Sequence, residues 1–282
     1  MNKVCLKRFV LISMVLVSVL QASEKNKNNE YVTVAILAKD KAHTLSLYLS
    51  CLERQTWPAS NIYLYIRTNN NNDDTVQILR DWVARVGNNY AKIYFDDTDV
   101  AESVQEFGQH EWNCTRFKVL GKIRQDSVDW ARENNSHYFV VDCDNLIYPE
   151  TLESMVNTNL PIVAPLLRCH EKPFYSNYHD AIDVNGYYIP SSFYYNILDQ
   201  TVKGMIEVLV IHCTYFIRYE ILDKVSYDDE SYRYEYVIFS DVARKQNIPQ
   251  YIDNRKLYGY ISFAENKEEF EREPFLDNFL LM

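Results

Sequence analysis

The chain has 282 residues, with 29 Lys and Arg against 39 Asp and Glu, which gives a formal net charge of −10. An acidic chain of this kind is a poor partner for the phosphates of nucleic acid, so the composition argues against a nucleic-acid-binding function. Its six cysteines form no CxxC pair, and this argues against a zinc cluster or a disulfide framework.

The N-terminus has the pattern of a signal peptide. Lys3, Lys7 and Arg8 precede an apolar stretch from Phe9 to Leu20, and small residues follow at a plausible cleavage point. We therefore predict a signal peptide over residues 1–22 and a protein of the secretory pathway, in the endoplasmic reticulum lumen or secreted. The apolar stretch is short for a bilayer, so no stable membrane span is expected, with a retained anchor as the alternative.

Residues 23–31 are polar, rich in Asn and Lys, and expected to be a mobile lead-in. Beyond them, strand-like and helix-like segments alternate with short connections. In chain order we predict strands at 32–37, 62–66, 91–95 and 138–141, and helices at 45–52, 76–83 and 116–133, with Asp40 as a cap for the first helix. This order predicts an α/β fold, a mostly parallel twisted sheet with helices on both faces, as a single domain over 32–282.

The second half reads less regularly. Segments 161–167 and 207–216 are strand-like, and between them Phe174 to Tyr195 is aromatic but too polar for a continuous core element. A functional loop is the better interpretation. Sugars stack on aromatic rings, so this loop offers candidates for an acceptor cleft, with a Tyr-rich surface as the alternative: Tyr175, Tyr178, Tyr187 and Tyr188.

Two carboxylates stand directly after the most buried-looking strand, in Asp142-Cys143-Asp144. Carboxylate oxygens suit Mn²⁺ or Mg²⁺, and such a cation can hold a nucleotide-sugar diphosphate through its remaining coordination positions. The carboxyl end of a strand buried on both faces is also where open α/β sheets bind ligands. Asp97-Thr98-Asp99 is a competing match, and a solvated turn is the alternative for either motif.

From about Val32 to Gly259 the chain resembles the N-terminal domain of procollagen galactosyltransferases. The similarity is strongest around Asp142 and extends, in the same order, over Val34–Lys39, Lys122–Gln125, Val140–Ile147, Val163–Leu167, Tyr175–Asn177 and Val210–Thr214. It implies a luminal GT-A fold that uses UDP-galactose and Mn²⁺ to modify hydroxylysine in collagen.

Carried over residue by residue, the resemblance implies Asp142 and Asp144 as metal ligands and His212 as a further metal or diphosphate ligand. A strand-borne histidine is otherwise most often a core residue. The resemblance also implies donor or acceptor contacts, although Asp73 could equally cap a helix and the lysines could be solvated: Lys39, Asp73, Lys122, Arg124, Tyr175 and Asn177.

One departure from the family bears on catalysis. The family pattern Phe-Asp-Asp-Ile-Ile reads Tyr234-Glu235-Tyr236-Val237-Ile238 here, so one carboxylate of the pair is replaced. Inversion needs a base for the acceptor hydroxyl, which makes Glu235 the first candidate and Asp241 the fallback, while a solvated helix carboxylate is the alternative for Glu235.

Together these features predict a metal-dependent glycosyltransferase. It would move galactose, or glucose as the second choice, from a UDP-sugar to a hydroxyl group with inversion, with hydroxylysine of a collagen-like protein as one acceptor. Two alternatives stay open: a catalytically silent relative that serves in binding or adhesion, and a transferase that acts on a glycan or lipopolysaccharide. A secreted hydrolase is disfavoured, because the chain has no Gly-flanked nucleophilic serine.

Overall fold

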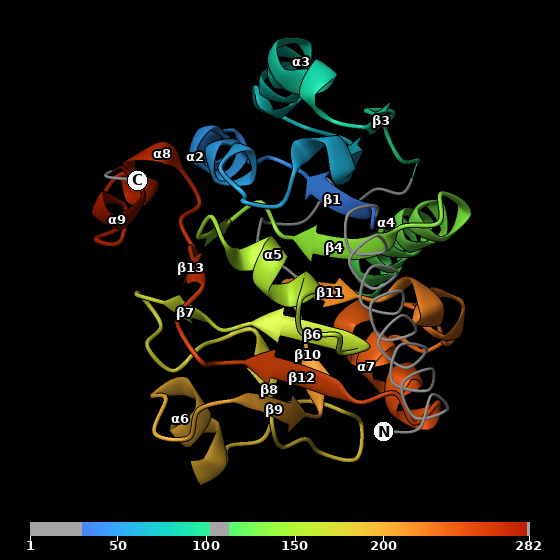
Figure 1. Cartoon of the computed structure of the whole chain (residues 1–282), viewed down its shortest axis with the longest axis vertical. Helices are drawn as coiled ribbons and strands as arrows, with labels where there is room; N and C mark the ends of the chain where they lie inside the picture. The colour runs from blue at the N-terminus through green and yellow to red at the C-terminus, as the bar shows by residue number, and fades with distance from the viewer. Residues whose placement is uncertain (1–29, 102–112, 281–282) are drawn as a thin grey trace, which may run out of the picture. The chain divides into compact units, whose positions relative to one another are not determined.

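A computed structural model describes residues 30–101 and 113–280 of the chain, and the described residues from Val32 onward form one compact unit (Figure 1). The predicted signal peptide and all but the last two residues of the predicted lead-in lie outside the described residues. Within the described part of the chain, no helix combines the length and apolar character needed to cross a bilayer.

A large mixed sheet forms the centre of the unit (Figure 1). In the described residues its order is β3-β2-β1-β4-β11-β6-β12-β9, and the β3-β2-β1-β4 half is parallel throughout. Strands β11 and β9 are antiparallel to their neighbours, while β12 is parallel to β6. The predicted α/β fold with a mostly parallel sheet is confirmed. The strands are β1 (Val32–Ala38), β2 (Ile62–Thr68), β3 (Lys92–Asp96), β4 (His137–Val141), β6 (Ile162–Pro165), β9 (Met205–Val208), β11 (Thr214–Ile217) and β12 (Gln250–Asp253).

Two small sheets pair segments that lie between or after the strands of the large sheet along the chain. Strand β13 (Gly259–Ile261) pairs with β5 (Asn145–Ile147) and with β7 (Leu167–Cys169), and β10 (Val210–Ile211) pairs with β8 (Tyr178–His179). The β13–β5 pairing depends on a glycine, because a Cβ atom on Gly259 would lie 2.0 Å from the carbonyl oxygen of Leu146. The turn that follows β4 is thereby held against the C-terminal part of the chain.

Helices cover both faces of the large sheet. The first face packs against α2 (Ala42–Glu53), α3 (Thr75–Val86) and α5 (Thr151–Val156), and the second against α4 (Cys114–Glu133), α6 (Ser192–Leu198) and α7 (Glu235–Lys245). The end of strand β4 is apolar because both of its faces are buried: Phe139 and Val141 face the first core, and Tyr138 and Val140 face the second. Short elements complete the chain: 3₁₀ turns Ala59–Asn61, Gly87–Asn89 and Tyr219–Lys224, and helices α8 (Lys267–Phe270) and α9 (Asp277–Leu280).

Two local predictions are wrong. Asp40 does not cap α2, since Lys41 is the N-cap residue; Asp40 instead has φ of 51° and accepts a hydrogen bond from the backbone N–H of Asn72 at 2.6 Å. Tyr178 does not line a cleft, because it is fully buried and its hydroxyl donates to the carbonyl oxygen of Tyr194 at 2.7 Å. In both cases a contact from a distant segment decides the side chain's position.

Candidate active site

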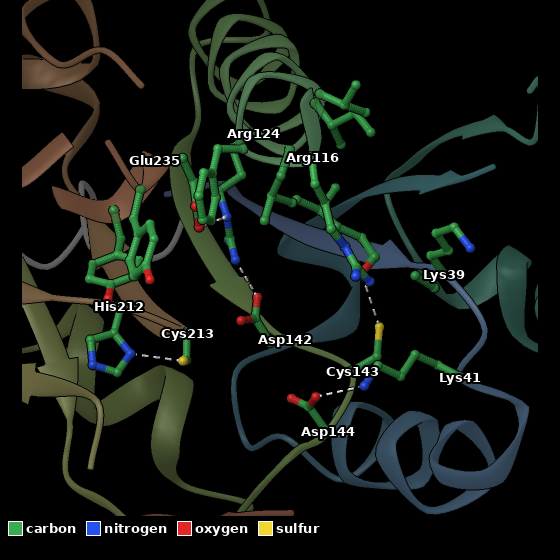
Figure 2. A pocket seen from close by; sticks show the side chains of 18 of the residues that line it. Lys39, Lys41, Arg116, Arg124, Asp142, Cys143, Asp144, His212, Cys213 and Glu235 are labelled. Atoms are coloured by element: carbon green, nitrogen blue, oxygen red, sulfur yellow. Dashed lines mark hydrogen bonds and ion pairs between the residues drawn. The ribbon is translucent and has the colours of Figure 1, made fainter. Parts of the chain in front are cut away.

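A cavity of about 370 Å³ opens at the carboxyl ends of β1, β2 and β4 (Figure 2). Parallel strands end at the same edge of a sheet, so the residues that follow these three strands meet there. Strand β11 runs antiparallel to β4 with Thr214 opposite Val141, which brings the residues that precede β11 to the same edge. The charged and aromatic residues that line the cavity are Lys39, Lys41, Arg67, Arg116, Phe117, Arg124, Asp142, Asp144, Tyr175, His212, Tyr234, Glu235, Tyr236 and Phe263.

Residues Asp142-Cys143-Asp144 form an acidic turn after β4, and hydrogen bonds from three directions hold its backbone. The N–H of Asn145 donates to the carbonyl of Asp142 at 2.8 Å and closes the turn, while the hydroxyl of Thr44 in α2 donates to the carbonyl of Cys143 at 2.7 Å. The N–H of Ser262 donates to the carbonyl of Asp144 at 2.9 Å. With the backbone held in this way, the side chains of Asp142 and Asp144 both point into the cavity (Figure 2).

Arg124 joins the acidic turn to Glu235. Its Nη2 lies 2.7 Å from Asp142 Oδ1, and its Nε lies 3.4 Å from Glu235 Oε1, with the arginine side chain only 5% exposed. Burial raises the pKa of Asp142 and that of Glu235, and Arg124 partly offsets both shifts by favouring the charged carboxylates. Glu235 is therefore a buried carboxyl at the first turn of α7 and not a solvated one.

A glycine makes this arrangement possible. Gly121 lies one turn before Arg124 on α4, where a Cβ atom would approach the carbonyl oxygen of Tyr227 to 3.1 Å and the Cβ of Glu235 to 3.6 Å. The absence of a side chain thus lets α4 approach the start of α7 closely. That approach places the Arg124 guanidinium between Asp142 and Glu235.

Lys41 is the cationic partner of the second carboxylate. Its Nζ lies 2.7 Å from Asp144 Oδ2, and the two side chains are 20% and 27% exposed. Burial would lower the pKa of Lys41, but the neighbouring Asp144 raises it overall, so the amine stays protonated. Each carboxylate of the acidic turn therefore has its own cation in this structure.

His212 lies among aromatic rings. Its ring centroid is 4.9 Å from that of Tyr236, 5.7 Å from that of Tyr175 and 5.2 Å from that of His179. Nδ1 contacts Cys213 Sγ at 2.9 Å, and Nε2 is buried with no hydrogen-bond partner among the described residues. Burial lowers the pKa of His212 well below its usual value, so the imidazole is neutral. Figure 2 shows Nε2 on the side of the ring that faces away from Asp142 and Asp144.

The side chains that could serve as metal ligands at the acidic turn fit a divalent cation only in part. Two carboxylates that enter one cavity suit a hard cation that takes its other ligands from a diphosphate and water. Among the described residues, however, no group of three or more His, Cys, Asp or Glu side chains is arranged to hold a metal. The structure therefore brings Asp142 and Asp144 together and leaves His212 outside a common ligand set.

The other predicted contacts divide into two groups. Lys39 and Tyr175 line the cavity, as does Arg124. Four predicted residues lie outside its lining and have partners elsewhere: Asp73, Lys122, Asn177 and Asp241. The carboxylates of the alternative motif, Asp97-Thr98-Asp99, also have other partners. Asp97 is paired with Arg80, and Asp99 accepts a hydrogen bond from the N–H of Asn70 at 2.6 Å.

Structural contacts account for the four residues outside the cavity. Asp73 accepts hydrogen bonds from the N–H groups of Thr75 and Ala42 and thereby ties α3 to α2. Asn177 is fully buried, with hydrogen bonds to backbone atoms of three residues, Pro165, Leu167 and Thr214.

Lys122 is exposed and pairs with Asp126 at 2.9 Å. Asp241 pairs with Arg233 at 2.9 Å and with Lys245 at 3.0 Å. Of the candidate acceptor residues in the aromatic loop, Tyr187 and Tyr188 also lie outside the cavity lining, and only Tyr175 is part of it.

Sequence reasoning missed three notable members of the site. Lys41 stands two residues after the predicted Lys39, just beyond the end of the matched segment Val34–Lys39, so the resemblance indicated Lys39 and not Lys41. Tyr234 and Tyr236 flank Glu235 and bring two rings to the cavity wall. Tyr236 stands where the family pattern has its second carboxylate, and that departure was the one available signal.

The family model for the N-terminal domain of glycosyltransferase family 25 matches residues 29–274. The chain belongs to glycosyltransferase family 25. It is 34% identical over 240 residues to procollagen galactosyltransferase 2 of Homo sapiens, an alignment that covers 82% of this chain and 38% of that protein. It is also 28% identical over 241 residues to the inactive glycosyltransferase 25 family member 3 of Mus musculus, covering 82% and 40%. The chain thus spans less than half the length of these family 25 relatives.

Solved structures confirm the GT-A fold predicted for a family 25 domain. The S. aureus TarS fragment 1–349 in complex with UDP-GlcNAc has a TM-score of 0.55 and 16% identity, over 86% of this chain and 61% of that one. A mannosyltransferase from Pyrobaculum calidifontis in complex with GDP-Man and Mn²⁺ has a TM-score of 0.53 and 12% identity, over 83% and 57%. At such identities the likeness establishes the fold alone.

Proposed function

We propose that this family 25 protein is a metal-dependent hexosyltransferase. It moves galactose, with glucose as the second choice, from a UDP-sugar to a hydroxyl acceptor with inversion. The observation that carries this proposal is the meeting of three carboxyl groups, those of Asp142, Asp144 and Glu235, in one cavity at the carboxyl edge of the sheet. A transferase needs both a site for the departing diphosphate and a base for the acceptor, and these groups can supply them.

Asp142 and Asp144 would hold Mn²⁺, or Mg²⁺, whose chemistry is to act as a Lewis acid on the leaving diphosphate. Arg124 keeps Asp142 in place through its ion pair, and Lys39 and Lys41 present ammonium groups at the same wall. Ammonium groups act as point charges toward phosphate oxygens. This wall of the cavity is therefore our candidate for the UDP diphosphate.

Glu235 would accept the proton of the acceptor hydroxyl. Burial raises its pKa, and a base whose pKa approaches the working pH accepts a proton more effectively in the transition state. Arg124 favours the charged form and so keeps the carboxylate available. The rings of Tyr175, Tyr234 and Tyr236 also line the cavity, where an acceptor sugar or side chain could stack.

Collagen-like protein is our first proposal for the acceptor, because relatives of the chain are named procollagen galactosyltransferases. Since the chain spans only 38% of that relative, a glycan or lipopolysaccharide acceptor is a second arm of the test. The predicted signal peptide supports a proposal that the reaction takes place in the endoplasmic reticulum lumen or outside the cell.

Hydrolysis of UDP-sugars in the absence of an acceptor tests the donor part of the proposal. We expect release of UDP that depends on Mn²⁺ and is fastest with UDP-galactose among UDP-galactose, UDP-glucose and UDP-N-acetylglucosamine. Transfer to a hydroxylysine-containing collagen peptide, set against a lipopolysaccharide acceptor, then identifies the acceptor class. Equal rates with and without the cation would contradict metal dependence.

A catalytically silent binding protein is the second candidate. Two observations favour it: Tyr236 replaces a carboxylate of the family pattern, and relatives at similar coverage are named inactive. A silent protein would still bind UDP with Mn²⁺ through the acidic turn but would release no UDP from any UDP-sugar. Binding and turnover measured on the same preparation therefore separate the two candidates.

A further inference from the structure

Lys41 occupies a position in which it must compete with a cation for Asp144. Its ammonium lies 2.7 Å from Asp144 Oδ2, on the carboxylate that the proposed function assigns to the metal. The backbone of Lys41 is fixed from two sides: its N–H donates to Thr75 Oγ1 at 2.7 Å, and its carbonyl accepts from the N–H groups of Thr44 and Leu45 at 3.1 Å. The ammonium is thus attached to a rigid point beside the acidic turn.

The two cations at the acidic turn differ in their freedom to move. Arg124 is 5% exposed and lies between Asp142 and Glu235, so leaving Asp142 would abandon a second carboxylate as well. Lys41 is 20% exposed, faces the open cavity and pairs with one carboxylate of the turn. A lysine side chain has four rotatable bonds and carries a compact charge. Of these two cations, Lys41 is therefore the one that can leave its carboxylate.

A divalent cation that arrives alone meets an unfavourable balance of charge. Asp142 and Asp144 are already neutralised by Arg124 and Lys41, and a metal on Asp144 would lie close to the Lys41 ammonium. Like charges at such a separation repel strongly in a partly buried site. A diphosphate changes this balance, because its oxygens supply negative charge for the metal and an alternative partner for the ammonium.

We propose that Lys41 couples metal binding to nucleotide binding: it holds Asp144 until a nucleoside diphosphate arrives, and it then moves to the diphosphate while the divalent cation takes the carboxylate. This inference rests on the proposed function. It assigns to Lys41 a positioning role that lies outside the chemical step, and it implies that the cation and the diphosphate enter the site together.

The test measures the affinity for Mn²⁺ alone in the Lys41→Met variant, from the electron paramagnetic resonance signal of free Mn²⁺. Methionine keeps most of the length of the stem and removes the charge. We expect Mn²⁺ without nucleotide to bind roughly tenfold more tightly or better, because a repelling charge is gone. In calorimetric titration at saturating Mn²⁺, UDP should bind more weakly than to the wild type, because the diphosphate has lost a partner.

Two further variants serve as controls. Lys122→Met removes an ammonium that is exposed, pairs with Asp126 at 2.9 Å and lies outside the cavity lining, so the affinity for Mn²⁺ alone should stay at the wild-type value. Lys41→Arg keeps a positive charge beside Asp144, so its affinity for Mn²⁺ alone should stay low. Melting temperatures of all variants establish that each is folded, and Lys41→Gln replaces Lys41→Met if the latter is not.

The outcomes separate this inference from the proposed function. If wild-type protein binds UDP with Mn²⁺ and Lys41→Met matches it in both titrations, Lys41 is only a structural ion pair and the inference fails alone. The inference also fails alone if Lys122→Met tightens Mn²⁺ binding as much as Lys41→Met. If the wild type shows no Mn²⁺-dependent UDP binding, the proposed function fails and the inference fails with it.

Discussion

The two halves of the central sheet contribute different chemistry to one cavity. From β1 to β4 the strands are parallel, and the residues after them bring charge: Lys39, Lys41, Asp142 and Asp144. The half that begins at β11 mixes strand directions and brings neutral imidazole and aromatic rings, with Glu235 at the start of α7 as its carboxyl group.

This difference follows from the way each half is built. In a parallel strand followed by a helix, the residue directly after the strand lies at the carboxyl edge of the sheet, where ligands bind. A short loop is therefore enough to place a polar residue at that edge. An antiparallel strand delivers the residue before it, and the loops that lead into β11 and α7 bring His212 and the tyrosines around Glu235. We therefore propose that the UDP-sugar donor binds to residues from the first half of the sheet and the acceptor to residues from the second half. The following variants test this division.

The largest effect is expected for Asp144→Asn, in the half of the sheet that brings charged residues to the cavity. The swap removes one negative charge at nearly constant volume, so the Mn²⁺-dependent part of the UDP affinity should disappear. Asp144 is preferable to Asp142 for this test, because loss of Asp142 would leave the Arg124 guanidinium buried without its closest partner. Calorimetric titration of UDP with and without Mn²⁺ measures the effect.

Asp97→Asn is the matched control for that prediction. Asp97 belongs to the alternative acidic motif and is paired with Arg80 outside the cavity lining. UDP affinity should be unchanged in this variant. Should Asp97→Asn remove the Mn²⁺ effect while Asp144→Asn retains it, the metal site would have to move to the end of β3.

Glu235→Gln on the aromatic side should separate binding from chemistry. UDP and Mn²⁺ affinities should stay near those of the wild type, while transfer falls by roughly 10²- to 10⁴-fold, the usual contribution of a positioned base. Because burial raises the pKa of Glu235, wild-type transfer should fall with decreasing pH earlier than for an ordinary glutamate. That acid limb should be absent from the residual activity of the variant.

Asp241→Asn is the control for the base. Asp241 already has three cationic partners, Arg233, Arg244 and Lys245, and lies outside the cavity lining. Transfer should be near normal after this change. A collapse of transfer in Asp241→Asn with normal transfer in Glu235→Gln would move the base by six residues and contradict our mechanism.

The first half was also the half that the sequence could predict. The strand expected at 32–37 is β1, and the helix expected at 116–133 is α4, because apolar periodicity and burial coincide there. The sequence indicates the acidic turn for the same reason, since the wholly apolar end of β4 predicts a strand buried on both faces. Its place at a cavity followed from general rules for α/β sheets.

Contacts between distant segments could not be predicted. No local pattern indicates that β11 inserts between β4 and β6, or that Arg124 meets Glu235 across the approach that Gly121 allows. The pairing of Lys41 with Asp144 likewise depends on the packing of α2 against the acidic turn. The sequence therefore indicates that Asp142 and Asp144 follow a buried strand, but it does not indicate the ion pairs that they form with Arg124 and Lys41.

His212→Ala tests whether the aromatic half contributes to the metal. His212 is packed by three rings and is not grouped with the two carboxylates among the described residues. We expect a loss of about 2 kcal/mol in the free energy of unfolding, from the cavity that the truncation leaves. Mn²⁺ affinity in the presence of UDP should change little. A large loss of Mn²⁺ affinity with a normal melting temperature would instead make His212 a ligand.

The last comparison pairs Asn177, whose side chain joins β6, β7 and β11, with the exposed Lys122, for which the smallest effect is expected. Asn177 donates to the carbonyl of Pro165 at 2.8 Å and accepts from the N–H of Leu167 at 3.1 Å, with no exposed surface. Asn177→Ala leaves those buried backbone groups unpaired, so the free energy of unfolding should fall by about 1 to 3 kcal/mol in denaturant titrations.

UDP affinity should be retained in folded Asn177→Ala, because the side chain does not line the cavity. Lys122→Ala is the comparison at the opposite extreme: it removes an exposed side chain in an i,i+4 ion pair and should change stability by no more than about 0.5 kcal/mol. If Asn177→Ala weakened UDP binding as strongly as Asp144→Asn while its stability stayed normal, a donor contact would come from the second half of the sheet, and the division between a charged donor side and an aromatic acceptor side would no longer hold.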